Sequence, residues 1–163
     1  MSKYKVLIVD NQQNTANHLG GLLEDFGYHV VSVCTEPHQA YDEYITHQPE
    51  IIFVDMMLDK QETGVDLVQK VKEIGNPFVV YSTDQHVDQV VEITHQAKPN
   101  VFFKKPFDTQ HLGTTLQFTL PTFLEEQKKF REQKRKSDLQ DLNIRELSET
   151  NAHLVAATWR ERD

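Results

Sequence analysis

The feature that most constrains this sequence is a regular alternation, over residues 1–120, between short apolar runs and longer segments with helical patterning. The apolar runs are residues 4–9, 28–33, 50–54, 78–81 and 101–103. The helical segments are 13–26, 36–47, 64–74, 84–96 and 108–120. Strands that alternate with helices and are apolar on both faces are typical of a parallel sheet covered on both sides. The sequence therefore predicts an α/β fold with a doubly wound, five-stranded parallel sheet.

Capping residues support several of these helix boundaries. Gly27 and Gly75 are suited to end helices, because glycine adopts the left-handed conformation of a C-terminal cap without strain. Thr35 is predicted as the N-cap of the second helix, with Pro37 in its first turn, and Asp108 as the N-cap of the fifth. Pro121 lacks an N–H group, so we expect the fifth helix to end before it.

Charge divides the chain near residue 120. Residues 1–120 contain 8 lysines and no arginine against 16 acidic residues, whereas residues 121–163 contain 9 basic and 9 acidic residues. The second segment also contains no glycine, and no proline after Pro121. We therefore predict a globular domain at residues 1–120 and an extended helix at 121–163, called the tail helix below.

The tail helix carries a heptad pattern that favours a coiled coil. One core position holds Phe123, Phe130, Ser137, Ile144, Asn151 and Thr158, and the other holds Glu126, Gln133, Gln140, Leu147 and Leu154. Leu139 and Leu142 fall outside this frame, which predicts a phase shift near them. Asn151 either fixes the register of pairing or is an exposed asparagine. A free polar helix of this length has only marginal stability, so we expect a homodimer through residues 121–163. We also expect an output domain that this chain does not contain.

Composition argues against several classes of protein. No apolar run approaches the roughly 20 residues that a membrane span needs, and the apolar stretch at the N-terminus leads directly into charge, unlike a signal peptide. The single cysteine, Cys34, excludes an internal disulfide and fits a reducing compartment, so we expect a cytoplasmic protein. The basic run at 128–136 lies in a segment of zero net charge, which favours a solvated helix face over nucleic-acid binding.

Polar residues follow or end four of the five predicted strands. They are Asp10 and Asn11 after the first, Asp55 after the third, Ser82 and Thr83 after the fourth, and Lys104, Lys105 and Pro106 after the fifth. Each alone is commonly a turn, cap or surface residue, but ligands bind open parallel sheets at this edge. Carboxylates with an amide oxygen suit Mg²⁺. A hydroxyl and an ammonium suit phosphoryl oxygens, and a carboxylate beside them can accept phosphorus.

These residues stand in motifs that resemble the receiver domain of two-component response regulators. The motifs are KVLIVDN, FVDMML, PFVVYST and VFFKKPF, and the resemblance covers residues 3–120. It implies a flavodoxin-like sheet of strand order 2-1-3-4-5 and a phosphoacceptor at Asp55. It also implies a histidine kinase or phosphotransfer protein as the donor, with no enzyme activity beyond self-catalysed phosphoryl transfer and slow autodephosphorylation.

The resemblance assigns roles to further residues. It implies that Mg²⁺ is held by Asp10, Asn11, Asp55 and the backbone carbonyl of Met57. It implies phosphoryl contacts from Ser82, Lys105 and the backbone of Thr83, a switch formed by Ser82 and Phe102, and a cis peptide bond before Pro106. These assignments are expectations carried over from the family.

Two alternative functions follow from departures at the site. Asn11 stands where the family usually has a second acidic residue, so we expect weaker magnesium binding. One alternative is therefore a pseudo-receiver, a docking or dimerisation module with little or no phosphorylation. The other alternative is a phosphohydrolase that forms a covalent aspartyl intermediate. Such an enzyme commonly needs a general acid two residues after the nucleophile. Met57 stands there and cannot donate a proton, which argues against this alternative.

Overall fold

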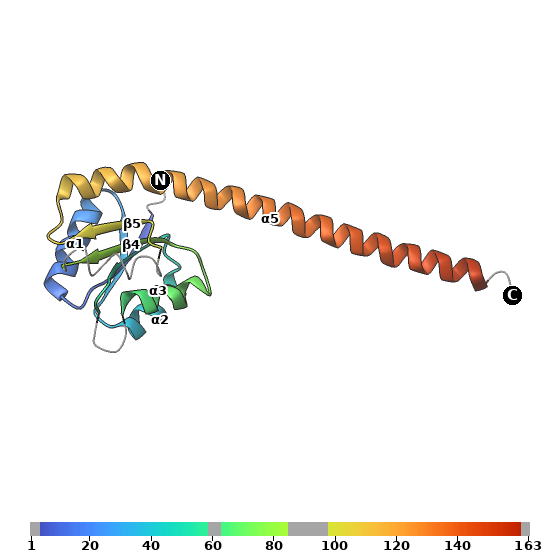
Figure 1. Cartoon of the computed structure of the whole chain (residues 1–163), viewed down its shortest axis with the longest axis horizontal. Coiled ribbons are helices and arrows are strands. Elements are labelled where there is room, and N and C mark those ends of the chain that lie inside the picture. The colour runs from blue at the N-terminus through green and yellow to red at the C-terminus, as the bar shows by residue number, and fades with distance from the viewer. Residues whose placement is uncertain (1–3, 59–62, 85–97, 161–163) are drawn as a thin grey trace. The chain divides into compact units, whose positions relative to one another are not determined.

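The computed structural model describes residues 4–58, 63–84 and 98–160, and the chain divides into two compact units, Met1–Phe118 and Thr119–Asp163 (Figure 1). The first unit contains the sheet. Its strands are β1 (Lys5–Val9), β2 (His29–Cys34), β3 (Ile51–Asp55), β4 (Phe78–Thr83) and β5 (Val101–Lys104). All neighbouring pairs are parallel, in the order β2-β1-β3-β4-β5. This confirms the predicted fold class and strand order.

Helices cover both faces of the sheet. They are α1 (Gln13–Asp25), α2 (Pro37–His47), α3 (Gly64–Lys72) and α5 (Thr109–Arg160). Figure 1 shows α2 and α3 on one side of the strands, with α1 and the first turns of α5 on the other. The predicted helix at 84–96 lies outside the described residues.

The core explains why β3 is apolar up to its last residue, Asp55. Val54 packs in a cluster with Tyr44 of α2 and Val68 of α3. The preceding residue, Phe53, points to the opposite face, where its ring stacks on Phe103 with centroids 6.3 Å apart. Successive side chains of a strand alternate between faces, so a strand between two helical layers needs apolar residues on both faces along its buried length.

Of the four predicted helix caps, two are confirmed and two are wrong. Helix α3 ends at Lys72 with Glu73 as its C-cap, before the predicted end at Gly75. Gly27 has a φ of +92° just after α1, and the Asp108 carboxylate accepts from the backbone N–H of His111 at 2.9 Å. The N-cap of α2 is Glu36 rather than Thr35, and it makes no side-chain capping bond. The fixed φ of Pro37 suits the first helical position, so the residue directly before it takes the cap position.

The predicted helix end at Pro121 is also wrong. Helix α5 is continuous from Thr109 to Arg160, with Pro121 inside it. Proline deprives the carbonyl of Gln117 of its helical hydrogen bond, but Gln117 and Pro121 are both exposed, so water can satisfy that carbonyl. No helix among the described residues is long and apolar enough to cross a membrane.

Candidate functional site

The carboxyl edge of the sheet gathers the polar residues that the sequence singled out. Asp10 directly follows β1, Asp55 ends β3, Ser82 and Thr83 end β4, and Lys105 directly follows β5. Asp10, Asp55, Ser82 and Thr83 are buried, with Asp55 the most accessible of them at 6% exposed. Charged groups are stable at such burial only when they are paired, so their mutual contacts decide what the site can do.

Lys105 bridges the two aspartates. Its Nζ donates to Asp10 Oδ2 at 2.7 Å and to Asp55 Oδ2 at 2.9 Å. This ammonium compensates the carboxylate that ends the apolar strand β3. Because one positive charge faces two negative ones, the buried group has a net charge of −1, which favours binding of a further cation.

Backbone amides hold the other oxygen of each carboxylate. The N–H of Gln12 donates to Asp10 Oδ1 at 2.9 Å, and the N–H of Met57 donates to Asp55 Oδ1 at 3.0 Å. Each carboxylate is therefore fixed through both oxygens. Such charge-assisted bonds are stronger than neutral ones, so the site is ordered before any ligand binds.

The two partners of this ion pair have shifted pKa values. Burial raises the pKa of Asp55, the hydrogen bonds from Lys105 and the Met57 N–H offset this only in part, and the neighbouring Asp10 adds to the rise. Burial lowers the pKa of Lys105, but its bonds to Asp10 and Asp55 outweigh this and raise it. Lys105 therefore stays cationic. An added cation would favour the ionised, nucleophilic form of Asp55.

Strand β4 is tied to both sides of the site. Ser82 is the register partner of Asp55, and its carbonyl accepts from the Met56 N–H at 2.9 Å. The Thr83 carbonyl accepts from the Lys105 N–H at 2.8 Å. These bonds extend β4 beyond its predicted end at residue 81 and place the Ser82 backbone beside the phosphoacceptor candidate.

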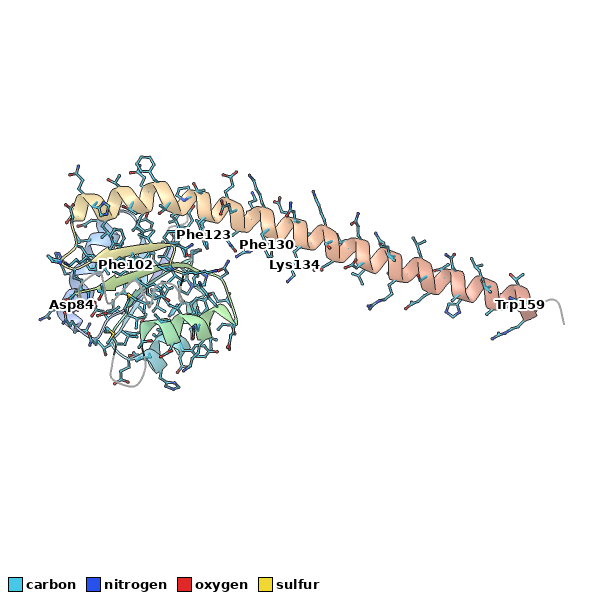
Figure 2. All side chains as sticks on the ribbon, in the orientation of Figure 1. Asp84, Phe102, Phe123, Phe130, Lys134 and Trp159 are labelled. Atoms are coloured by element: carbon cyan, nitrogen blue, oxygen red, sulfur yellow. The ribbon has the colours of Figure 1, made fainter. Side chains whose placement is uncertain are left out.

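The remaining predicted residues lie around this centre. Phe102 lies on β5 (Figure 2). It is half-buried and packs against the core cluster that contains Tyr81. The peptide bond between Lys105 and Pro106 is cis. A cavity of about 480 Å³ opens beside Lys105; it is lined by Gln12, Asn14, Thr15, His18, Asp84, Lys105, Pro106 and Phe107. The cavity reaches the site from the side of α1.

The oxygens at this edge suit magnesium. Within the described ranges, no three His, Cys, Asp or Glu side chains lie close enough to hold a metal ion. The buried carboxylates that the described residues bring to this edge are those of Asp10 and Asp55. Asn11 is exposed next to Asp10, and Met57 follows Asp55 by two residues. Mg²⁺ typically takes one or two carboxylates and keeps several waters, so this donor set fits it. Because Asn11 is neutral, the site has one negative charge fewer than it would have with an acid at position 11.

Gly64, the first residue of α3, supports the site through close packing, a role that the sequence did not assign to it. Its N–H donates to the Met56 carbonyl at 2.9 Å. A Cβ at this position would collide with the carbonyl oxygen of Asp55 and lie 2.7 Å from Val54 Cγ1. Glycine thus allows α3 to begin directly against the strand that carries Asp55. The signal in the sequence is a lone glycine between the loop after β3 and the first turn of a helix.

Fold and site together define a class of protein. A five-stranded parallel sheet of order 2-1-3-4-5, with two buried aspartates and a lysine at its carboxyl edge, is a flavodoxin-like domain with an acidic pocket where such sheets bind ligands.

The chain belongs to the response regulator receiver domain family, which matches residues 6–117. Receiver domains are signalling domains of two-component systems and not classical enzymes.

Relatives and solved structures agree with this family. The sensory transduction protein LytR of Staphylococcus haemolyticus is 26% identical over 110 residues, which cover 66% of this chain and 42% of that protein. The chain therefore spans less than half of this relative's length.

The signal receiver domain of a modulated diguanylate cyclase from Desulfovibrio desulfuricans has a TM-score of 0.69 at 22% identity, covering 77% of this chain and 99% of that structure. Chemotaxis protein CheY4 of Vibrio cholerae has a TM-score of 0.64 at 21% identity, covering 72% and 99%. At these identities the two structures show the fold alone.

Proposed function

We propose that this chain accepts a phosphoryl group on Asp55 from a histidine kinase or a phosphotransfer protein. The observation that carries the proposal is the bridging of Asp55 and Asp10 by Lys105, at 2.9 and 2.7 Å, in a buried site. A carboxylate fixed beside a cation is positioned to act as an oxygen nucleophile.

In the proposed step, a carboxylate oxygen of Asp55 forms a bond to phosphorus while the phosphorus–nitrogen bond of the donor's phosphohistidine breaks. The electron pair returns to the imidazole nitrogen, which takes a proton from solvent. Negative charge then lies on the phosphoryl oxygens. Lys105, the Ser82 hydroxyl and the Thr83 backbone N–H are the groups of this chain that would stabilise it.

Asp10, Asn11, Asp55 and the Met57 carbonyl would hold Mg²⁺. When bound, the ion supplies positive charge that neutralises the phosphoryl oxygens. Asn11 offers an oxygen but no charge, so we expect weaker magnesium binding than a second acid would give.

The consequence of phosphorylation would be a switch. A phosphoryl group adds about −1.5 to −2 charges, toward which the Ser82 hydroxyl would move, while Phe102 would turn inward on β5. Helix α5 would transmit the change to a homodimer formed through residues 121–163 and to an output domain of a longer protein. A cytoplasmic location fits the single cysteine, Cys34, which is buried.

The test is incubation of the chain with Mg²⁺ and acetyl phosphate, followed by intact mass measurement. One added phosphoryl group is expected on the wild type and none on Asp55→Asn. Omitting Mg²⁺ should abolish the adduct. An unmodified wild type, or an equally modified Asp55→Asn variant, would refute the proposal.

A pseudo-receiver is the second candidate, and the neutral Asn11 beside a site already bridged by Lys105 favours it. This function predicts no magnesium binding at millimolar concentrations. Isothermal titration of the wild type with MgCl₂ separates the two candidates, because heat of binding that Asp55→Asn lacks would contradict the pseudo-receiver.

A further inference from the structure

We infer that residues 137–160 of α5 pair with the same segment of a second copy in a parallel, in-register, two-stranded coiled coil, in which Asn151 meets its own counterpart. The inference rests on the dimerisation proposed above and adds its orientation and register.

The pairing face consists of apolar residues on an otherwise polar helix. Ile144 and Leu147 are both 63% exposed, and Leu154 is 62% exposed. With Asn151 and Thr158 they recur at intervals of three and four residues, which places them on one side of a helix. Figure 2 shows the tail as one unbroken helix that bears side chains such as Phe130 and Trp159. This apolar face makes no hydrophobic cluster within the described residues, so a second helix is its natural partner.

The residue types at the core positions favour a coiled coil of two parallel helices. β-Branched Ile144 and Thr158 occupy one core position, and Leu147 and Leu154 occupy the other. β-Branched residues at the first position with leucine at the second pack best in parallel dimers.

Asn151 favours the same arrangement. In a parallel, in-register pair each core residue faces the identical residue of the other helix, so two Asn151 amides can bond to each other. An antiparallel pair places the first core position opposite the second, and the two Asn151 side chains do not meet. A buried amide without a partner is costly, so Asn151 selects the parallel register.

Charge gives an independent comparison of the two orientations. Residues 128–136 contain six basic residues and one acidic residue, and residues 137–150 contain four acidic residues and one basic residue. An antiparallel pair that matched these segments would place Leu147 opposite Phe130 but Ile144 opposite Gln133, and it would leave Leu154 outside the matched segments. In the parallel pair, Leu147 and Leu154 each face the same leucine of the other helix. The pair also brings Lys136 near Asp141 of the other helix, and residues at these two flanking positions commonly form salt bridges between the helices of a coiled coil.

The parallel arrangement carries an electrostatic cost, which makes it testable. It sets the two basic 128–136 segments side by side and the two acidic 137–150 segments side by side, and in both places like charges repel. Salt screens this repulsion. Association should therefore tighten as salt is added, whereas a charge-matched antiparallel pair should weaken.

Leu142 supplies a matched control. It is 53% exposed and lies outside both core positions, and because α5 is helical without interruption it stays on a different side of the helix from Ile144 and Leu147. Leu147→Ala and Leu142→Ala therefore remove the same side chain from the pairing face and from another face.

The first experiment is sedimentation equilibrium of the full chain. We expect a dimer whose dissociation constant rises about tenfold or more in Leu147→Ala, changes less than about twofold in Leu142→Ala, and falls about threefold from low to high NaCl. Circular dichroism checks that both variants stay helical. Equal effects of the two variants, weaker association in high salt, or a trimer would overturn the inference.

The second experiment is cross-linking with oxidised glutathione, which is reduced as two thiols form a disulfide. Asn151→Cys should give covalent dimers in high yield, whereas Glu149→Cys, outside both core positions, should give few. The wild type controls for Cys34, which is fully buried. A dimer that Asn151→Cys fails to link would overturn the register but leave the proposed dimerisation standing. A monomer would overturn both, and the acetyl phosphate assay tests phosphorylation separately.

Discussion

At the scale of single residues, the charge on Asp55 is explained by two contacts. Lys105 and the Met57 N–H each bind one of its oxygens, which allows a carboxylate to end a strand whose other residues are apolar. The same contacts leave the site one positive charge short, because Asp10 shares the lysine. Asn11 adds no negative charge to the site, so the site attracts Mg²⁺ less strongly than it would with an acid at position 11.

Asn11→Asp should therefore strengthen magnesium binding. One further carboxylate near the ion lowers the dissociation constant by about tenfold, corresponding to roughly 1.4 kcal/mol. The measurement is isothermal titration with MgCl₂, together with the rate of phosphorylation by acetyl phosphate, which should rise. The nearby exposed Gln13→Glu is the control and should change affinity little. Unchanged affinity in Asn11→Asp would argue against position 11 as a ligand.

Asp55→Asn should stabilise the metal-free protein at neutral pH. A folded-state pKa above its ordinary value of 3.8 means that the stability contributed by Asp55 is fully present below that value and is lost as pH rises through the raised pKa. A neutral amide avoids this loss, which should increase the free energy of unfolding by about 1 kcal/mol, a typical single-residue effect. Urea unfolding in EDTA from pH 4 to 8 measures the difference, which should shrink toward the acid end. A constant difference, or a less stable variant at pH 8, would contradict the pKa argument.

At the scale of elements, the strand ends position the site, and Gly64 allows α3 to begin directly against β3. The alternating pattern predicts every strand core, whereas the boundaries shift where tertiary bonds intervene. Strand β4 continues through Thr83 because Lys105 and Met56 donate to its last carbonyls. Similarly, α5 continues through Pro121, where local propensity alone predicts an end.

Gly64→Ala should disturb the phosphoacceptor strand. The new Cβ would collide with the Asp55 carbonyl, and such overpacking costs about 1–3 kcal/mol. Phosphorylation by acetyl phosphate should fall together with stability in urea. Gly21→Ala is the matched control, because a Cβ there meets nothing within 4 Å and alanine in a helix should stabilise by roughly 0.8–1 kcal/mol. A Gly64→Ala variant as stable as the wild type would show that α3 can retreat from β3.

At the scale of the whole molecule, the proposed role couples the site to association through α5. Beryllium fluoride with Mg²⁺, a phosphoryl analogue, should change the dimer dissociation constant of the wild type by about 5-fold or more, within the usual range of allosteric coupling. Sedimentation measures this change. Asp55→Asn should show no change, and Leu147→Ala should keep the direction of the shift at weaker affinity. An equal dissociation constant with and without the analogue would show that the switch at Asp55 does not control dimerisation.

By itself, the sequence determined the order of strands and helices, the apolar core of the sheet and the set of polar residues that reach its carboxyl edge. Periodicity and strand ends are local properties, so they can be read from neighbouring residues. Only the tertiary structure decided that a single lysine bridges Asp10 and Asp55, and that α3 leaves no room for a side chain at Gly64. These features depend on distances between elements far apart in the chain, such as the 95 positions that separate Lys105 from Asp10, and packing rather than local pattern sets those distances.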